Sequence, residues 1–278
     1  MTKPILKWVG GKTQLVDTLV PLFPRVIQKY YEPFVGGGSV LLAVLANREI
    51  TVRGKIYATD ANAPLIGLYK NIQTNHVALF DQLQTMIAEY NDSPEYYYAV
   101  REKYNAMTVD DKCSVAGSAL FLFLNKTCFR GMFRINRSGG FNVPFGNYKR
   151  PEIINRAHLE EVHTLIQPVI FECCDFETTM KKMAGGDFAY LDPPYVPENN
   201  TSFVGYTSDG FDGKTHIRLF NVCKSCPGAF IMSNSDTAVI REQFTDDKYH
   251  IQTAECRRRI NSRRPDATAN ETILANYE

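Results

Sequence analysis

Residues 30–39 have the sequence Tyr-Tyr-Glu-Pro-Phe-Val-Gly-Gly-Gly-Ser, and an apolar stretch with helical character follows at residues 40–45. A strand, a glycine turn and a helix in this order open the βα unit of nucleotide-binding folds. Glycine has no Cβ, so the backbone of such a turn can approach a bound ligand closely. The stretch therefore predicts an α/β fold with a ligand at this turn.

A second predicted strand, residues 55–59, ends at Asp60. This acid follows the glycines by about twenty residues, where such folds place the carboxylate that binds ribose hydroxyls. The combination indicates a cofactor that contains adenosine. The alternative is an aspartate that only begins a turn before Asn62, and it does not explain the spacing.

The tetrapeptide Asp192-Pro193-Pro194-Tyr195 follows an apolar run, residues 188–191, that predicts a buried strand. Ligands of open α/β sheets bind at the carboxyl ends of strands. Proline has no N–H and a fixed φ, so the two prolines stiffen the turn and leave carbonyls available as acceptors. The tetrapeptide is therefore a candidate catalytic site.

The side chains of this tetrapeptide suit an aromatic amine as substrate. The Asp192 carboxylate and the Pro193 carbonyl could accept its two hydrogens while the Tyr195 ring stacks on the base. These acceptors would direct the delocalised lone pair at an electrophile, which is catalysis by positioning and electrostatics. The alternative is a strand that ends in a proline-rich turn with a solvated aspartate.

Further elements follow from periodicity and turn residues. We expect helices from residue 64 to about 125 and from 155 to 166, and strands at 169–173, 229–234 and 271–276. Asp175 and Phe176 follow one of these strands and could hold an adenine ring. Residues 197–213 are expected to form a mobile loop.

The 278 residues are 44% hydrophobic and 22% charged, as in an ordinary soluble protein. We expect no membrane span, no secretion and no metal site, and a location in the cytoplasm, or in the nucleus or viral factory if the source is a virus of eukaryotes. The seven cysteines are an odd number, and we expect reduced structural thiols, with Cys223-x-x-Cys226 a weak metal signal.

The net charge is only +1, but six basic and no acidic residues lie between Lys126 and Arg150. A second cluster comprises Arg257, Arg258, Arg259, Arg263 and Arg264. Within the first cluster, residues 132–136 and 140–143 predict a β-hairpin. Arginine and asparagine side chains on a two-stranded ribbon can recognise guanine and adenine in a major groove, so the hairpin favours DNA as a partner. A solvated basic face is the alternative.

Four motifs together resemble the Dam-type adenine-N6 DNA methyltransferases of the D12 class, alpha group. They are Lys-Trp-Val-Gly-Gly-Lys at 7–12, Glu-Pro-Phe-Val-Gly-Gly-Gly-Ser at 32–39, Phe-Asn-Val-Pro-Phe-Gly at 141–146, and Asp-Pro-Pro-Tyr at 192–195. The resemblance implies S-adenosyl-L-methionine as methyl donor, double-stranded DNA as substrate and base flipping. It implies a Rossmann-like catalytic domain, residues 1–62 and 160–278, with an inserted, mainly helical target-recognition domain, residues 63–159, that carries the hairpin.

The resemblance also implies roles for individual residues. Those at cofactor-binding positions are Trp8, Lys12, Glu32, Phe34, Gly36, Gly38, Asp60, Asp175 and Phe176. Those at the catalytic positions that hold the target base are Asp192, Pro193, Pro194 and Tyr195. Those at DNA-binding positions are Lys7, Phe129, Arg130, Arg134, Asn142 and Pro144. Arg134 matches an arginine that recognises guanine.

One position departs from the family pattern. Arg130 stands in Phe-Arg-Gly-Met, where relatives that methylate GATC usually have asparagine. We therefore expect a short palindrome that contains adenine, with GATC and CATG both open. A cognate restriction endonuclease that acts independently is a further expected partner.

Other functions remain open from the sequence alone. An RNA or protein-glutamine methyltransferase is the nearest, although the glutamine enzymes carry asparagine where Asp192 stands. A DNA-binding protein that has lost catalysis is another. Gly11-Lys12-Thr13 resembles the end of a phosphate loop, but Leu6 stands where that loop needs a glycine.

Overall fold

The computed structural model describes residues 2–136, 138–197, 211–257 and 268–278. The chain forms two compact units. The first comprises Met1–Val16, Val35–Arg48 and Asp60–Cys173, and the second comprises Asp17–Phe34, Glu49–Thr59 and Cys174–Glu278. The predicted mobile loop at 197–213 lies outside the described residues except for residues 197 and 211–213, and the predicted arginine cluster lies outside them except for Arg257.

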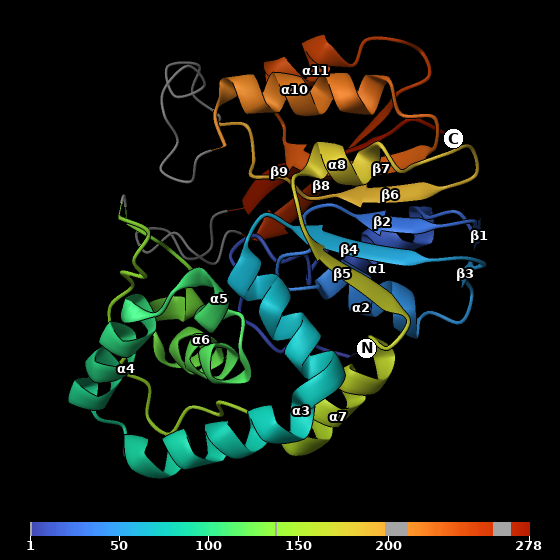
Figure 1. The fold of residues 1–278 in the computed structure, drawn as a ribbon. Helices are drawn as coiled ribbons and strands as arrows, with labels where there is room; N and C mark the ends of the chain where they lie inside the picture. The colour runs from blue at the N-terminus through green and yellow to red at the C-terminus, as the bar shows by residue number, and fades with distance from the viewer. Residues whose placement is uncertain (1, 137, 198–210, 258–267) are drawn as a thin grey trace. The chain divides into compact units, whose positions relative to one another are not determined.

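The second unit is built on a mixed sheet (Figure 1). Its strands are β2 (Tyr30–Glu32), β4 (Ile56–Asp60), β6 (Phe188–Leu191), β7 (Ala229–Ser235), β8 (His250–Arg257) and β9 (Thr268–Ala275). They lie in the order β4-β2-β6-β7-β9-β8. The pairs from β4 to β7 are parallel, whereas β9 pairs antiparallel with both β7 and β8. The predicted mixed α/β fold is confirmed; β8 was not predicted.

Short elements complete this unit. They are α1 (Val16–Leu19), the 3₁₀ turn η1 (Val20–Leu22), and a parallel pair of strands, β1 (Val26–Ile27) and β3 (Thr51–Val52). The helices α8 (Phe176–Met180), α10 (Gly213–Lys224) and α11 (Ala238–Gln243) lie together beside the strands (Figure 1).

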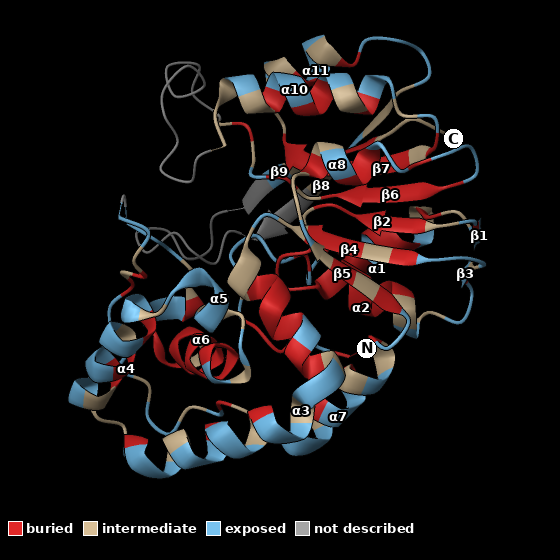
Figure 2. Ribbon diagram, viewed as in Figure 1, coloured by how far each residue is buried: buried red, intermediate tan, exposed pale blue. Residues whose placement is uncertain are grey.

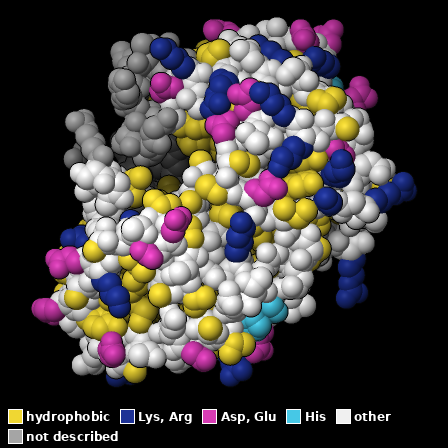
Figure 3. Space-filling model, viewed as in Figure 1, with side chains coloured by type: hydrophobic (Ala, Val, Ile, Leu, Met, Phe, Trp, Pro, Cys, Tyr) yellow, Lys and Arg dark blue, Asp and Glu magenta, His cyan; other side chains and the backbone are white. Residues whose placement is uncertain are grey.

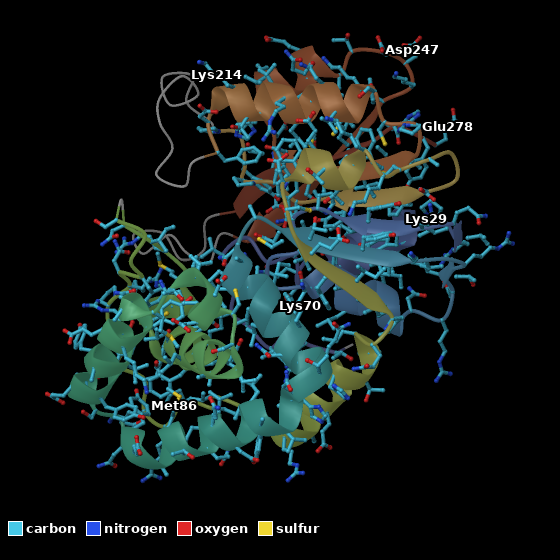
Figure 4. The ribbon with its side chains drawn as sticks, in the orientation of Figure 1. Lys29, Lys70, Met86, Lys214, Asp247 and Glu278 are labelled. Atoms are coloured by element: carbon cyan, nitrogen blue, oxygen red, sulfur yellow. The ribbon has the colours of Figure 1, made fainter. Side chains whose placement is uncertain are left out.

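The core of the second unit forms where these helices meet the sheet. Helix α10 buries Leu219, Phe220 and Cys223 on one face, and these pack in a cluster with Phe230 and Met232 of β7. Strands β6 and β7 are buried almost throughout (Figure 2). Figure 3 shows cationic and acidic side chains intermixed on the surface around these helices. Lys214, labelled in Figure 4, lies at the start of α10. Helix α10 is thus amphipathic, as expected for a helix that covers a sheet.

The first unit is mainly helical. Its elements are α2 (Ser39–Ala46), α3 (Ala63–Tyr90), α4 (Pro94–Ala106), α5 (Val109–Lys112), α6 (Val115–Thr127), the 3₁₀ turn η2 (Phe129–Gly131), α7 (Arg156–Leu165) and β5 (Val169–Cys173). Helix α6 is buried on nearly all sides, which is typical of a central helix (Figure 2). The predicted helices are confirmed. The predicted recognition domain, residues 63–159, falls inside this unit, and the division into catalytic and recognition domains stays a prediction.

Local chemistry explains where the long helices begin and bend. The Asn62 side chain accepts a hydrogen bond from the Leu65 N–H, and Ser93 caps α4 in the same way. A proline follows each cap in the first turn. Asn75 has φ −135°, so α3 is interrupted there, and the labelled Lys70 and Met86 lie on its two halves (Figure 4).

The predicted hairpin is only partly correct. Among the described residues of 128–145, the antiparallel pairing consists of two isolated bridges, Ile135 to Phe141 and Cys128 to Phe145, and no strand is formed. The Asn136 side chain accepts the N–H groups of Ser138 (3.0 Å) and Gly140 (2.9 Å). The Asn136 N–H also donates to the Gly140 carbonyl at 2.8 Å, and the Asn142 N–H donates to the Arg134 carbonyl at 3.1 Å. The two segments therefore pair next to the turn but form no extended strands.

The glycine turn between β2 and α2 brings an aromatic side chain against the backbone. Gly36 and Gly38 have positive φ values of 47° and 73°. The Tyr69 hydroxyl donates a hydrogen bond of 2.9 Å to the Gly36 carbonyl. A Cβ at Gly38 would lie 2.7 Å from that hydroxyl. Glycine is therefore required at position 38 both for its backbone angle and for space.

Gly38→Ala tests this double requirement against Gly10→Ala. Gly10 also has positive φ (79°), but a Cβ there meets nothing within 4 Å. Gly10→Ala should lower the free energy of unfolding by about 1–2 kcal/mol, the cost of a left-handed alanine. Gly38→Ala adds a steric clash in a packed region and should lower it by roughly 1–3 kcal/mol more. Urea denaturation measures both, and equal losses would contradict the steric argument.

Candidate functional site

The predicted catalytic tetrapeptide lies in the second unit, directly after the buried strand β6. The residue that follows it is anchored to the end of β7. The Val196 N–H donates to Asn234 Oδ1 at 2.9 Å, and the Ser235 hydroxyl donates to the Val196 carbonyl. Because β6 and β7 are parallel neighbours, these bonds hold the turn at the carboxyl edge of the sheet.

The environment of the tetrapeptide fixes its aromatic ring. Pro193 is buried, Asp192 and Tyr195 are half-buried, and Pro194 is exposed. The Tyr195 hydroxyl donates a hydrogen bond of 2.7 Å to Glu271 Oε2 on β9. Burial raises the pKa of Tyr195 far above its ordinary value, and the charges of Asp192 and Glu271 raise it further. Tyr195 therefore remains a neutral phenol with its ring tied to the sheet.

Glu271 was not predicted as a site residue. It lies 76 positions after Tyr195, within a segment recognised only as a strand, and no motif surrounds it. A single sequence carries no signal for such a contact.

A second group of predicted residues in this unit meets around an aromatic pair. The rings of Phe34 and Phe176 stack with centroids 5.5 Å apart. Arg218 of α10 places its guanidinium 4.5 Å from the centre of the Phe176 ring and donates to both oxygens of Asp175, at 2.7 and 3.1 Å. Asp175 also caps α8 by accepting from the Glu177 N–H at 2.9 Å. The structure thus brings Phe34, Asp175 and Phe176 together, and Arg218 is an unpredicted partner.

In the first unit, Asp60 is bound to the glycine turn. Its carboxylate accepts from the Gly36 N–H at 3.2 Å and from the Asn62 N–H at 2.9 Å. Burial raises the pKa of Asp60, and these N–H groups oppose the rise. The spacing argument from the sequence therefore corresponds to a direct contact between the acid and the turn.

Trp8 lies against the same turn. A Cβ at Gly36 or at Gly37 would come within 2.8 Å of the Trp8 side chain. On the other side the indole stacks on Phe133, with centroids 5.4 Å apart and planes 18° apart. The glycines thus let the backbone approach an indole, and Phe133 is a partner that the sequence did not indicate.

Two further predicted cofactor residues are buried. The Lys12 N–H donates to the Ser39 hydroxyl at 3.0 Å, and its ammonium donates to the Gly10 carbonyl. Glu32 lies in β2 and accepts a hydrogen bond of 2.7 Å from the Tyr30 hydroxyl. Glu32 is 2% exposed, so it belongs to the core, and its cofactor role stays a prediction.

The predicted DNA-binding residues lie in the first unit. Phe129 is 43% exposed, and the guanidinium of Arg130 lies 5.2 Å from the centre of its ring. Arg134 is exposed, and its Nε donates to Asn142 Oδ1 at 2.7 Å. These two side chains were predicted as separate base contacts, and the structure shows that Asn142 orients Arg134. Pro144 is exposed, and its carbonyl accepts from the Phe129 N–H at 2.8 Å.

Other features bear on the class of protein. No helix of the described residues is long and apolar enough to cross a membrane. Six of the cysteines in the described part of the chain form no disulfide with one another, namely Cys113, Cys128, Cys173, Cys174, Cys223 and Cys226. In that same part, no three histidine, cysteine or acidic side chains are grouped so that they could hold a metal ion.

Comparison with known proteins identifies the family. Residues 8–260 match the model of the D12 class N6 adenine-specific DNA methyltransferases. The type II methyltransferase M.MjaIII of Methanocaldococcus jannaschii is 39% identical over 78% of this chain and 78% of its own. The type II methyltransferase M1.LlaDCHI of Lactococcus lactis subsp. cremoris is 31% identical over 99% of this chain and 95% of its own. A DNA adenine methylase of Haemophilus influenzae is 33% identical over 89% and 84%.

The matched region contains the glycine turn, the loop of residues 128–145 that includes Arg134, and the Asp-Pro-Pro-Tyr turn. This agrees with the resemblance found in the sequence. The chain therefore belongs to the D12 class of N6 adenine-specific DNA methyltransferases.

Proposed function

We propose that this enzyme transfers a methyl group from S-adenosyl-L-methionine to N6 of an adenine flipped out of a short palindromic duplex site, of the GATC or CATG class. The observation that carries the proposal is the Tyr195 ring, which Glu271 holds at the carboxyl end of β6, in the same turn as Asp192 and the buried Pro193. A fixed aromatic ring beside two acceptors is what an extrahelical adenine needs.

The chemistry follows from these groups. Adenine N6 is a weak nucleophile because its lone pair is delocalised into the ring. The Asp192 carboxylate and the Pro193 carbonyl accept the two N6 hydrogens and direct the lone pair at the methyl carbon. The N6–CH₃ bond forms as the sulfur–CH₃ bond breaks, the electron pair of the latter goes to sulfur, and the N6 proton leaves to solvent. A neutral Tyr195 stacks on the base and keeps it in line.

The cofactor residues in each unit have surfaces that suit S-adenosyl-L-methionine. In the first unit, Asp60 at the glycine turn suits ribose hydroxyls, and Trp8 provides an aromatic face. In the second unit, the stacked rings of Phe34 and Phe176 suit the adenine of the cofactor. The reaction takes only the methyl group from this cofactor.

We assign recognition of the target bases to the loop of residues 128–145, which contains Arg134. Nε and one hydrogen of Nη2 are engaged by Asn142, at 2.7 and 3.3 Å. The other guanidinium hydrogens are enough for a bidentate contact with O6 and N7 of guanine. Duplex DNA is therefore the proposed partner, and a restriction endonuclease specific for the same site, acting independently, is a second.

Asp192→Ala removes one acceptor of the reactive amine. Methyl transfer from labelled S-adenosyl-L-methionine to duplex DNA should fall by on the order of a hundredfold or more, the size of effect seen when one electrostatic contact to a transition state is lost. DNA affinity, measured by fluorescence anisotropy, should stay close to that of the wild type. Asp246→Ala, at an exposed position, is the control and should leave both unchanged. Retained transfer in Asp192→Ala would refute the role.

Arg134→Ala should relax specificity at one guanine and lose roughly 1–3 kcal/mol of discrimination there. Asn142→Ala should act in the same direction with a smaller effect, because it removes the side-chain acceptor of Arg134 Nε but keeps the backbone carbonyl that accepts from Nη2. Methylation rates on duplexes changed at single positions measure both. An equal loss on every sequence would instead identify Arg134 as a phosphate contact.

A further inference from the structure

We propose that Asn125, near the end of α6, is a positioning residue for target recognition that fixes Lys7 against the loop of residues 128–145. The inference rests on the proposed function, in which Lys7 contacts the bases of the target site. It concerns a residue that neither the motifs nor the predicted roles include. Lys7, Asn125 and the loop all belong to the first unit.

The Asn125 amide binds two segments at once. Its Oδ1 accepts from the Lys7 N–H at 2.9 Å, and its Nδ2 donates to the Lys7 carbonyl at 2.7 Å and to the Gly131 carbonyl at 3.2 Å. Asn125 is 2% exposed, and both amide hydrogens and the oxygen are used. One side chain therefore replaces a strand partner for Lys7 and joins it to Gly131.

Neighbouring residues restrict the direction in which the Lys7 side chain can point. Gly131 has φ +64°, and a Cβ there would lie 2.4 Å from the Lys7 Cβ, so the lysine stem passes directly over this glycine. The Lys7 ammonium lies 4.4 Å from the centre of the Tyr148 ring. The Tyr148 hydroxyl accepts from the Arg130 N–H at 2.9 Å. Lys7 thus packs against the loop of residues 128–145, although it lies 118 positions before Asn125, the residue that holds it there.

The charges nearby favour an anionic ligand. Burial lowers the pKa of Lys126, the charge of Lys7 lowers it further, and the charge of Glu152 opposes the fall, so the two ammonium groups lie close enough to repel one another. Such repulsion is relieved when a polyanion such as DNA binds. A residue that holds Lys7 in this place works against that repulsion and keeps the ammonium directed at the ligand.

The rigidity of Asn125 follows from its helix. The preceding residues of α6, Phe121 to Leu124, are each at most 1% exposed, so the helix has little freedom to shift. Without the amide, the Lys7 backbone would lose partners for both of its polar groups and could move relative to Gly131. We therefore expect loss of the amide to reduce discrimination between sites, and not only stability.

Asn125→Ser tests the inference, with Asn71→Ser as the matched control. Asn71 is a buried asparagine of the same unit whose Nδ2 donates to the Cys113 carbonyl at 2.8 Å and to the Ser118 hydroxyl at 2.9 Å, away from Lys7. The measurement is the ratio of kcat/KM on the target duplex to kcat/KM on duplexes changed at one base pair, together with the melting temperature. Asn125→Ser should lower the ratio about tenfold, within the range of one lost base contact. Asn71→Ser should lower the melting temperature and leave the ratio unchanged.

Gly131→Ala provides a second test if Asn125→Ser fails to fold. Its Cβ would displace the Lys7 side chain while the Asn125 amide stays intact, and the ratio should again fall. Gly186→Ala is its control, because Gly186 also has positive φ (84°), but its Cβ would meet only the flexible Gln28 side chain, at 3.0 Å.

The outcomes separate the two proposals. A wild-type enzyme that methylates no adenine in duplex DNA would overturn the proposed function and this inference with it. An active wild type with an unchanged ratio in Asn125→Ser, or in Gly131→Ala where the first variant does not fold, would overturn only the role of Asn125. An equal fall in Asn71→Ser would overturn it too, since general loosening of the unit would then explain the effect.

Discussion

The contact between an aromatic side chain and a glycine backbone is the constraint on which the first unit depends. Gly36 and Gly37 leave room for the Trp8 indole, and Gly38 leaves room for the Tyr69 hydroxyl. Asp60 then binds the Gly36 N–H. Any side chain in this turn would separate these groups. Because these three glycines have no Cβ, their backbone can contact the residues that we assign to cofactor binding.

Each proposed contact with base or DNA involves a residue that is held by a hydrogen bond to a neighbouring side chain. Tyr195 is tied to Glu271 on β9, Arg134 to the side chain of Asn142, and Lys7 to Asn125 on α6. Transfer of a methyl group to a weak nucleophile depends on alignment more than on acid–base chemistry. These hydrogen bonds therefore orient the residues to which we assign the contacts with base and DNA.

Sequence patterns predicted the elements that local chemistry determines. The start of the helical region near residue 64 was predicted because its signals are local: Asn62 caps α3 and a proline follows in the first turn. The hairpin was only partly correct, because its two segments pair next to the turn without forming extended strands. Glu271, Arg218 and Asn125 were missed because their partners lie far away in sequence, and only folding brings them together. The spacing of Asp60 after the glycines led to a residue that contacts the turn, because a recurrent βα unit fixes this spacing, and its role in cofactor binding stays a prediction.

Single-molecule sequencing of DNA from a methylation-deficient host that expresses this enzyme tests the central claim most directly, because it scores N6-methyladenine in its sequence context. We expect modified adenine at one short palindrome, and the identity of that site decides between GATC, CATG and another sequence at once. DNA without any modified adenine, from cells in which the enzyme is shown to be expressed, would contradict the proposed function.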